Sequence, residues 1–175
     1  DHPKGKENLQ RLQEQFSDYI IIPTSAEGEL ALREAQKHEL LDYVPGSTDF
    51  SITETGNNTL SEKQQTALQF IKESLLDTYE TGTGIQAVLN AAVFDLLKRK
   101  AIHPGGVGKL EDSDGNTLPD CFLMKEDATA LDFAYALHTD FGKNFVKAVN
   151  VKTKMPVGKE HILEHLDIIE IMSTK

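Results

Sequence analysis

The sequence predicts an α+β chain, in which a mainly helical segment is followed by a small sheet that carries one helix. Two observations predict this class. Apolar residues recur at helical spacing between residues 61 and 97, and a capping residue opens that pattern. Beyond residue 109, short apolar runs bounded by turn residues flank one capped helical stretch. With 175 residues and 39% hydrophobic content, the chain is long enough for one or two compact units.

The first 45 residues have the pattern of half an α/β unit. Apolar residues three and four positions apart predict a helix over residues 6–16. The continuous apolar run 19–22 predicts a buried strand of a parallel sheet, although no partner strand is evident in the chain. Thr24-Ser25 then follows as a helix N-cap, with Glu27 and Glu29 in the first turn, and we expect this second helix to run to about Leu41.

The next segment predicts a helical hairpin after a polar connection over residues 45–59. Ser61 and Gln64 form a capping box, and the Gly-rich break at 81–84 ends the first helix. A second helix closes with the basic residues 98–100, where positive charge suits the helix dipole. We expect the two helices to pack face to face. The apolar stripe of the second helix comprises Ile85, Val88, Leu89, Ala92, Val93, Leu96 and Leu97.

The last segment begins after a Gly-rich linker predicted at residues 103–108. Asp114-Gly115 predicts a hairpin turn, and Thr129 caps a helix that runs through Leu137. Strands are predicted over residues 121–124, 145–155 and 167–172. The chain therefore divides into residues 1–45, 46–104 and 105–175.

The order strand, helix, strand pair and closing strand is that of a ubiquitin-like β-grasp. The segments Asp127 to Ala134, Met155 to Gly158 and Leu166 to Ile171 resemble one β-grasp family, the TGS domain. TGS domains accompany threonyl-tRNA synthetases, GTPases and alarmone synthetases, where they bind and regulate. The resemblance therefore implies a binding function for this part of the chain.

The region from Asp1 to Phe50 resembles the end of the G domain in Obg-related, ribosome-associated GTPases of the archaeal type. The resemblance is carried by Ile22 to Glu27, Glu29 to Arg33 and Asp42 to Gly46, with Phe94 to Leu97 and His138 to Lys143 further along. In that family a helical segment and a TGS domain follow in this order. The chain begins with Asp rather than Met, so we expect a C-terminal fragment of such a GTP-binding protein.

A guanine-binding role for the loop before the second helix is implied by this resemblance. By itself, Ser25-Ala26 after a predicted strand indicates only a helix cap. In the family, a backbone N–H of this motif meets the guanine carbonyl oxygen. Asp1 lies at the distance expected for the Asp of the Asn-Lys-x-Asp guanine motif. The cofactor-binding candidates are therefore Asp1, Ser25 and Ala26.

The phosphate loop G-x-x-x-x-G-K-[ST] is absent from the sequence. Without its backbone N–H groups, its Lys and its Ser/Thr ligand, triphosphate and Mg²⁺ have no binding partner. We expect no cofactor and no catalysis for this chain alone, and GTP with Mg²⁺ only for an intact parent.

A local basic segment contrasts with the net charge of −10. Residues 141–159 contain five lysines and no acidic residue. Strand alternation predicts Asn150, Lys152 and Lys154 on one face. This face is either a solvated edge that resists aggregation or a surface that contacts RNA phosphates, and the sequence leaves both open. The candidates for RNA or partner binding are Lys143, Lys147, Asn150, Lys152, Lys154 and Lys159.

Composition and spacing limit the other function classes. The acidic pI of about 5.0 argues against a general nucleic-acid coat. One cysteine, no signal peptide and no apolar run of spanning length predict a cytoplasmic chain without a membrane partner. The six histidines do not have metal-ligand spacing, and no catalytic constellation is evident. The expected partners are the ribosome or RNA, and a second copy that pairs through the exposed N-terminal segment; the alternative is a regulatory module that binds a small ligand such as a nucleotide.

Overall fold

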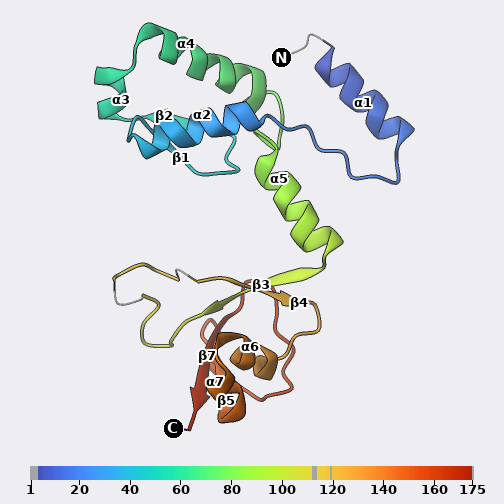
Figure 1. Cartoon of the computed structure of the whole chain (residues 1–175), viewed down its shortest axis with the longest axis vertical. Coiled ribbons are helices and arrows are strands. Elements are labelled where there is room, and N and C mark those ends of the chain that lie inside the picture. The colour runs from blue at the N-terminus through green and yellow to red at the C-terminus, as the bar shows by residue number, and fades with distance from the viewer. Residues whose placement is uncertain (1–3, 112–113, 119, 175) are drawn as a thin grey trace. The chain divides into compact units, whose positions relative to one another are not determined.

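The computed structural model describes residues 4–111, 114–118 and 120–174, and it divides into two compact units (Figure 1). The first unit takes in residues 1–92 and the second residues 93–175. The segment predicted as 1–45 and most of the segment predicted as 46–104 therefore lie in the first unit. Residues 93–104 belong to the second unit.

The first unit is mainly helical and contains one small antiparallel sheet. Its two strands pair Leu41 with Ile52 and Tyr43 with Phe50. A π-helical segment, Lys72–Leu76, continues the fourth helix. The helix that begins at Ile85 continues as a second π-helical segment, Ala91–Leu96. The elements are α1 Gly5–Gln15, α2 Ala26–Lys37, β1 Leu41–Tyr43, β2 Phe50–Ile52, α3 Glu54–Thr59, α4 Glu62–Ile71 and α5 Ile85–Asn90.

The core of the first unit lies between α2, β1 and α4. Leu32 of α2 and Leu41 of β1 are almost completely buried, and Leu68 of α4 joins the same cluster. The cluster of buried residues consists of Leu32, Leu41, Tyr43, Leu60, Leu68 and Leu76. This packing differs from the predicted helical hairpin, because α4 buries its apolar face against α2 and β1. On the helix that begins at Ile85, Leu89 and Leu96 are 50% and 68% exposed.

The strand predicted over residues 19–22 is wrong, since this segment has no regular structure. Tyr19 and Ile20 are 73% and 56% exposed. A strand needs a neighbour for its N–H and C=O groups, and β1 and β2 pair with each other instead. The helix over residues 6–16 is confirmed by α1, Gly5–Gln15.

The polar connection predicted over residues 45–59 is also wrong, because it contains β2 and α3. Gly46, with a φ of 88°, provides the left-handed turn residue between β1 and β2. Thr53 then caps α3 by accepting a hydrogen bond from the backbone N–H of Gly56 at 3.0 Å. The helix α2 ends at Lys37 rather than near Leu41, since Glu39 has a φ of 59° and the chain turns there.

The second unit is a five-stranded mixed sheet with the strand order β4-β3-β7-β5-β6. The strands β3 and β7 are parallel, and His103 pairs with Ile168 between them. The other neighbouring strands are antiparallel. This arrangement is the β-grasp predicted from the sequence. The elements are β3 Arg99–Pro104, β4 Phe122–Lys125, α6 Ala130–Leu137, α7 Thr139–Lys143, β5 Phe145–Asn150, β6 Met155–Val157 and β7 Ile168–Ser173.

The helix α6 covers one face of this sheet (Figure 1). Phe133 of α6 is completely buried and meets Phe122 of β4 edge to face, with ring centroids 5.7 Å apart. Such aromatic pairs add about 0.5–1.5 kcal/mol beyond the burial of their area. Ile102, Ala148 and Ile169 contribute from three strands of the sheet, so helix and sheet share one core.

Three predictions for residues 98–155 are wrong. Residues 98–100 do not close a helix, because β3 begins at Arg99 and the linker predicted at 103–108 starts inside that strand. Lys98, with a φ of 48°, marks the change of direction. The single strand predicted over residues 145–155 is a hairpin, with β5 and β6 joined by a turn.

The capping predictions are confirmed. Ser61 and Gln64 form the capping box of α4, and Thr129 and Asp132 form that of α6. The Thr129 hydroxyl accepts from the Asp132 N–H at 3.2 Å, and the Asp132 carboxylate accepts from the Thr129 N–H at 2.8 Å. Hydrogen bonds from Thr129 to the Asp132 carboxylate outweigh burial and hold the pKa of that group below its usual value.

We expect Thr129→Ala to destabilise the second unit by about 1 kcal/mol, because it removes the hydroxyl that caps α6. The measurement is urea unfolding followed by circular dichroism. Thr117→Ala is the control, since Thr117 is exposed and lies outside helix α6. An equal loss of stability in both variants would contradict the capping role.

Candidate functional site

The first turn of α2 holds Ser25 in a fixed position. The Ser25 hydroxyl accepts from the backbone N–H of Gly28 at 3.2 Å, and the Ser25 carbonyl accepts from the N–H of Glu29 at 3.1 Å. The Ser25 N–H donates to the carbonyl of Thr83 at 2.8 Å. Ser25 is half-buried and Ala26 is exposed. Ala26 is the first residue of the helix, so the helix itself provides no acceptor for its backbone N–H.

Immediately behind this turn lies a buried carboxylate. Glu29 is 5% exposed and accepts three side-chain hydrogen bonds. The donors are Arg33 Nε at 2.6 Å, the Tyr43 hydroxyl at 2.9 Å and the Thr83 hydroxyl at 2.6 Å. They come from α2, β1 and the turn before α5, so one carboxylate joins three segments of the first unit. We call Glu29, Arg33, Tyr43 and Thr83 the Glu29 cluster.

The carboxylate of Glu29 stays ionised inside this cluster. Burial raises the pKa of Glu29, but hydrogen bonds from Thr83, Arg33 and Tyr43, together with the Arg33 charge, outweigh it, and the pKa lies below its ordinary value of 4.5. Burial and the neighbouring Glu29 raise the pKa of the Tyr43 hydroxyl above its ordinary value of 10.0. Glu29 is thus an anion and Tyr43 a neutral donor at neutral pH.

The turn before α5 lies directly against the loop that leads into α2. Thr83 is 1% exposed. Gly84 has a φ of 77°, and a Cβ at this position would lie 1.8 Å from the carbonyl oxygen of Pro23. Only glycine fits this approach. The sequence break predicted at residues 81–84 is confirmed, and it forms a contact with the guanine-loop candidates that the sequence did not predict.

Asp1, the third guanine candidate, lies outside the described residues. Ser25 and Ala26 lie at the start of α2. The role of Asp1 stays a prediction.

The lysine candidates lie on several elements: Lys143 ends α7, Lys147 lies on β5, Lys152 and Lys154 lie in the β5–β6 turn, and Lys159 follows β6. Lys152 and Lys154 belong to the turn rather than to a strand, so the predicted alternation with Asn150 on one face is wrong. Lys154 has a φ of 59°, which is the left-handed conformation of a turn. All five lysines are exposed: Lys143, Lys147, Lys152, Lys154 and Lys159.

Asn150 has a structural role in this turn. Its Oδ1 accepts from the N–H groups of Lys152 and Thr153 at 3.1 and 3.2 Å. Its Nδ2 donates to Asp167 at 2.9 Å, and Asp167 is 6% exposed. Asn150 thus fixes the backbone of the turn that carries Lys152 and Lys154, and its amide is occupied within the protein.

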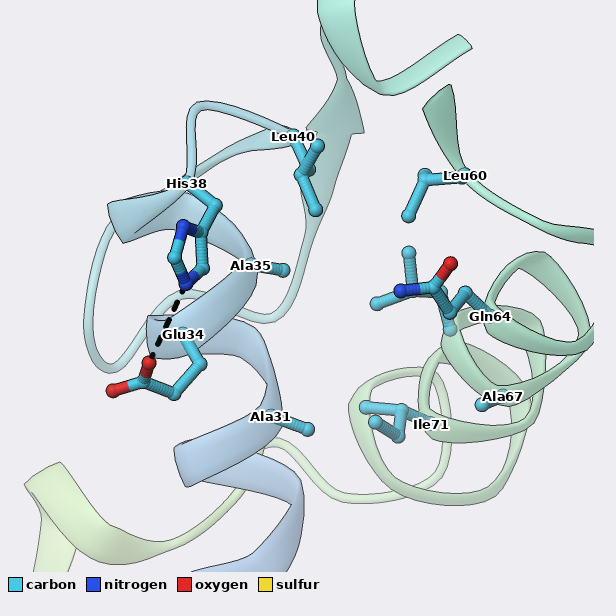
Figure 2. A pocket seen from close by; sticks show the side chains of 10 residues that line it. Ala31, Glu34, Ala35, His38, Leu40, Leu60, Gln64, Ala67 and Ile71 are labelled. Atoms are coloured by element: carbon cyan, nitrogen blue, oxygen red, sulfur yellow. Dashed lines mark ion pairs between the residues drawn. The ribbon is translucent and has the colours of Figure 1, made fainter. Parts of the chain in front are cut away.

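An apolar cavity of about 240 Å³ lies between α2 and α4 (Figure 2). Figure 2 shows Ala31 and Ala35 facing Ala67 and Ile71 across it. At its edge, His38 Nε2 lies 3.9 Å from a carboxylate oxygen of Glu34. Pockets that bind drug-sized ligands usually have a volume of about 300–1,000 Å³. We therefore interpret this cavity as imperfect packing between the two helices.

Across residues 4–111, 114–118 and 120–174, no cluster of His, Cys, Asp or Glu could hold a metal ion. Within the same ranges, every helix is too short or too polar to cross a lipid bilayer.

Comparison with known proteins identifies the family. Residues 1–105 match the model of the Obg-like GTPase YGR210-like, G4 motif-containing domain, and residues 113–173 match the TGS domain. The chain belongs to the YGR210-like Obg-like GTPases. The TGS match agrees with the β-grasp of the second unit.

Two relatives of these Obg-like GTPases support the assignment. A GTP-binding protein of Methanocaldococcus jannaschii is 42% identical over 174 residues, which are 99% of this chain and 43% of that protein. The crystal structure of a GTP-binding protein from Pyrococcus horikoshii OT3 is 38% identical with a TM-score of 0.65, over 97% of this chain and 42% of that one. The chain thus spans less than half the length of these relatives.

Glu29 and Thr83 were not among the residues predicted from the sequence. The sequence predicts Glu29 as an acidic residue in the first turn of a helix, within a segment that resembles the family, but two of its three donors, Tyr43 and Thr83, come from distant segments. The one available signal was the helical position of Glu29 beside Gly28 and Leu32, which places it on the buried side of α2.

We expect Glu29→Gln to destabilise the first unit by roughly 3 kcal/mol at pH 7, because the negative charge is lost and the amide NH2 group would face donors where a carboxylate oxygen now accepts, while the amide oxygen can accept on one side only. The folded-state pKa of Glu29 lies below 4.5, so its stabilisation is fully present above pH 4.5 and is lost as the pH falls through the lower folded value. The difference in the free energy of unfolding between the wild type and Glu29→Gln should therefore become smaller below pH 4.5.

Urea unfolding between pH 7 and pH 3.5 measures this gap. Glu34→Gln is the matched control on the same helix, since the Glu34 side chain is 52% exposed and its ion pairs with Lys37 and His38 are 3.8 and 3.9 Å long. A pH-independent gap for Glu29→Gln would show that its charge contributes nothing.

Proposed function

We propose that this chain provides two binding elements of a translation-associated GTP-binding protein. One is the guanine loop at Ser25 and Ala26, and the other is a TGS domain that contacts the ribosome or RNA. Membership in the Obg-like GTPases supports the first element. In this proposal the Ala26 N–H bonds the guanine carbonyl oxygen and Asp1 bonds the base N–H groups. The proposal places the protein in the cytoplasm, where ribosomes work.

The basic β5–β6 hairpin carries the second element. Five exposed lysines lie within residues 141–159, which contain no acidic residue, although the whole chain has a net charge of −10. Lysines of this kind position a protein on phosphates and do not read base sequence. The turn that holds Lys152 and Lys154 is fixed by Asn150, so the two ammonium groups extend from an ordered backbone. This combination favours a phosphate surface as the partner.

The same proposal assigns no catalysis to the chain by itself. Residues that would hold the triphosphate and Mg²⁺ are absent from its sequence, and the described residues contain no cluster that could hold a metal ion. GTP and Mg²⁺ belong, in this proposal, to a complete protein that also carries a phosphate loop.

We expect the double variant Lys152→Glu, Lys154→Glu to weaken ribosome binding and to reduce its dependence on salt, because two phosphate contacts are lost. Co-sedimentation with ribosomes at several salt concentrations provides the measurement. Lys37→Glu, Lys63→Glu is the control, since it makes the same charge change on exposed lysines of the first unit. Equal binding by all three proteins would remove the hairpin from the proposal.

We expect the purified chain to hydrolyse no GTP and to show no thermal shift with GTP and Mg²⁺. A ligand at a hundredfold its dissociation constant would stabilise the chain by about 2.7 kcal/mol, so tight binding would be visible. Measurable turnover would contradict the assignment.

A second candidate function is a regulatory site for a small anionic ligand. It is favoured by a cavity of about 380 Å³ beside β3, β4 and the start of α6, which is lined by Arg99 and Lys125 together with Asp127 and Asp132. The same thermal-shift screen, extended to alarmones, separates the two functions. A shift that Lys125→Ala abolishes would favour the second.

A further inference from the structure

The structure assigns a positioning role to Thr83 in guanine recognition. We infer that Thr83 and Glu29 hold the loop at Ser25 and Ala26 in the shape that recognises a guanine base. This inference rests on the proposed guanine function and adds to it a residue far away in the sequence, on the turn that opens α5.

Thr83 binds the loop at two points. Its backbone carbonyl accepts from the Ser25 N–H at 2.8 Å, just before the helix begins. Its hydroxyl donates to Glu29 at 2.6 Å, one turn further along α2. The two bonds bracket the first turn of α2, which contains the N–H of Ala26. A shift of Thr83 would therefore move that N–H relative to the rest of the unit.

The packing around Thr83 leaves little freedom for such a shift. Thr83 is 1% exposed, and the next residue, Gly84, lies so close to Pro23 that a methyl group at its Cα would collide with the Pro23 carbonyl. The Tyr43 hydroxyl donates at 2.9 Å to Glu29 Oε2, the same oxygen that the Thr83 hydroxyl binds, and it accepts from the Gly46 N–H at 3.4 Å. The loop is thus supported from β1 and from the turn before α5.

The bond from Ser25 to Thr83 and the contact between Pro23 and Gly84 fix the end of the segment that precedes the loop. A misplacement of about 1 Å can cost roughly a hundredfold in function, so contacts that hold this segment bear directly on the recognition of a base.

The chemistry of the base makes the role testable. Guanine has a carbonyl oxygen at the position where adenine has an amino group, so an N–H donor at Ala26 attracts the first and repels the second. A displaced donor should reduce the preference for GTP over ATP, whereas contacts to the phosphates are common to both nucleotides and should be unaffected.

The experiment uses the complete gene product and measures the dissociation constants of GTP and ATP by competition with a fluorescent nucleotide. We expect Thr83→Val, which keeps the shape and removes the hydroxyl, to reduce the preference for GTP about tenfold with unchanged ATP affinity. Thr83→Ser keeps the hydroxyl and should restore the preference. Thr59→Val is the control, because Thr59 is exposed and bonds only within its own helix.

Ala26→Pro tests the underlying guanine assignment separately. Proline is well tolerated at the first position of a helix and removes only the N–H of that residue. Ser25 before it has φ −129° and ψ 92°, an extended conformation that a following proline accepts. We expect this variant to lose the preference for GTP.

The outcomes are distinct. If Ala26→Pro lowers the preference and Thr83→Val does not, the role of Thr83 is overturned and the guanine loop stands. An equal loss of GTP and ATP affinity in Thr83→Val would mean general destabilisation and would also overturn it. If Ala26→Pro leaves the preference unchanged, or the complete protein does not prefer GTP, the guanine assignment fails and the inference falls with it.

Discussion

The need to keep one buried carboxylate hydrogen-bonded organises the first unit. A charge removed from water is strongly unfavourable unless donors replace the water. Glu29 obtains its donors from Arg33 on the same helix, from Tyr43 on β1 and from Thr83 before α5. Three segments separated along the chain must therefore meet at one point. The position of Ser25, which Thr83 also binds, follows from that requirement.

The features that depend on neighbouring residues were predictable from the sequence. Ser25, Ser61 and Thr129 cap their helices as expected, because a cap is a contact over three residues. The β-grasp was also predicted, since its helix and its last strand have clear apolar patterns. The strand at residues 19–22 was predicted from its apolar run alone, and such a run does not show whether a partner strand exists.

The features that depend on distant contacts were not predictable. The strand β3 has an even mixture of basic and apolar residues, and only its pairing with β4 and β7 distinguishes it from a helix end. The lysines at residues 143–159 were recognised from composition, but Asn150 was grouped with them although its amide holds the turn. At the loop proposed to bind guanine, the family resemblance indicated Ser25 and Ala26, whereas the contacts from Glu29 and Thr83 are evident only in the structure.

The parallel pairing of β3 with β7 has a consequence for synthesis of the chain. His103 pairs with Ile168, so β3 leaves the ribosome long before its central partner does. During that interval only the antiparallel partner β4 is available to it, and Ile102, which is completely buried in the finished sheet, has no helix above it until α6 follows. Contacts between residues so far apart form slowly. Until β7 and α6 have been synthesised, the nascent β3–β4 pair therefore exposes an unpaired edge and an apolar face, two features that favour aggregation.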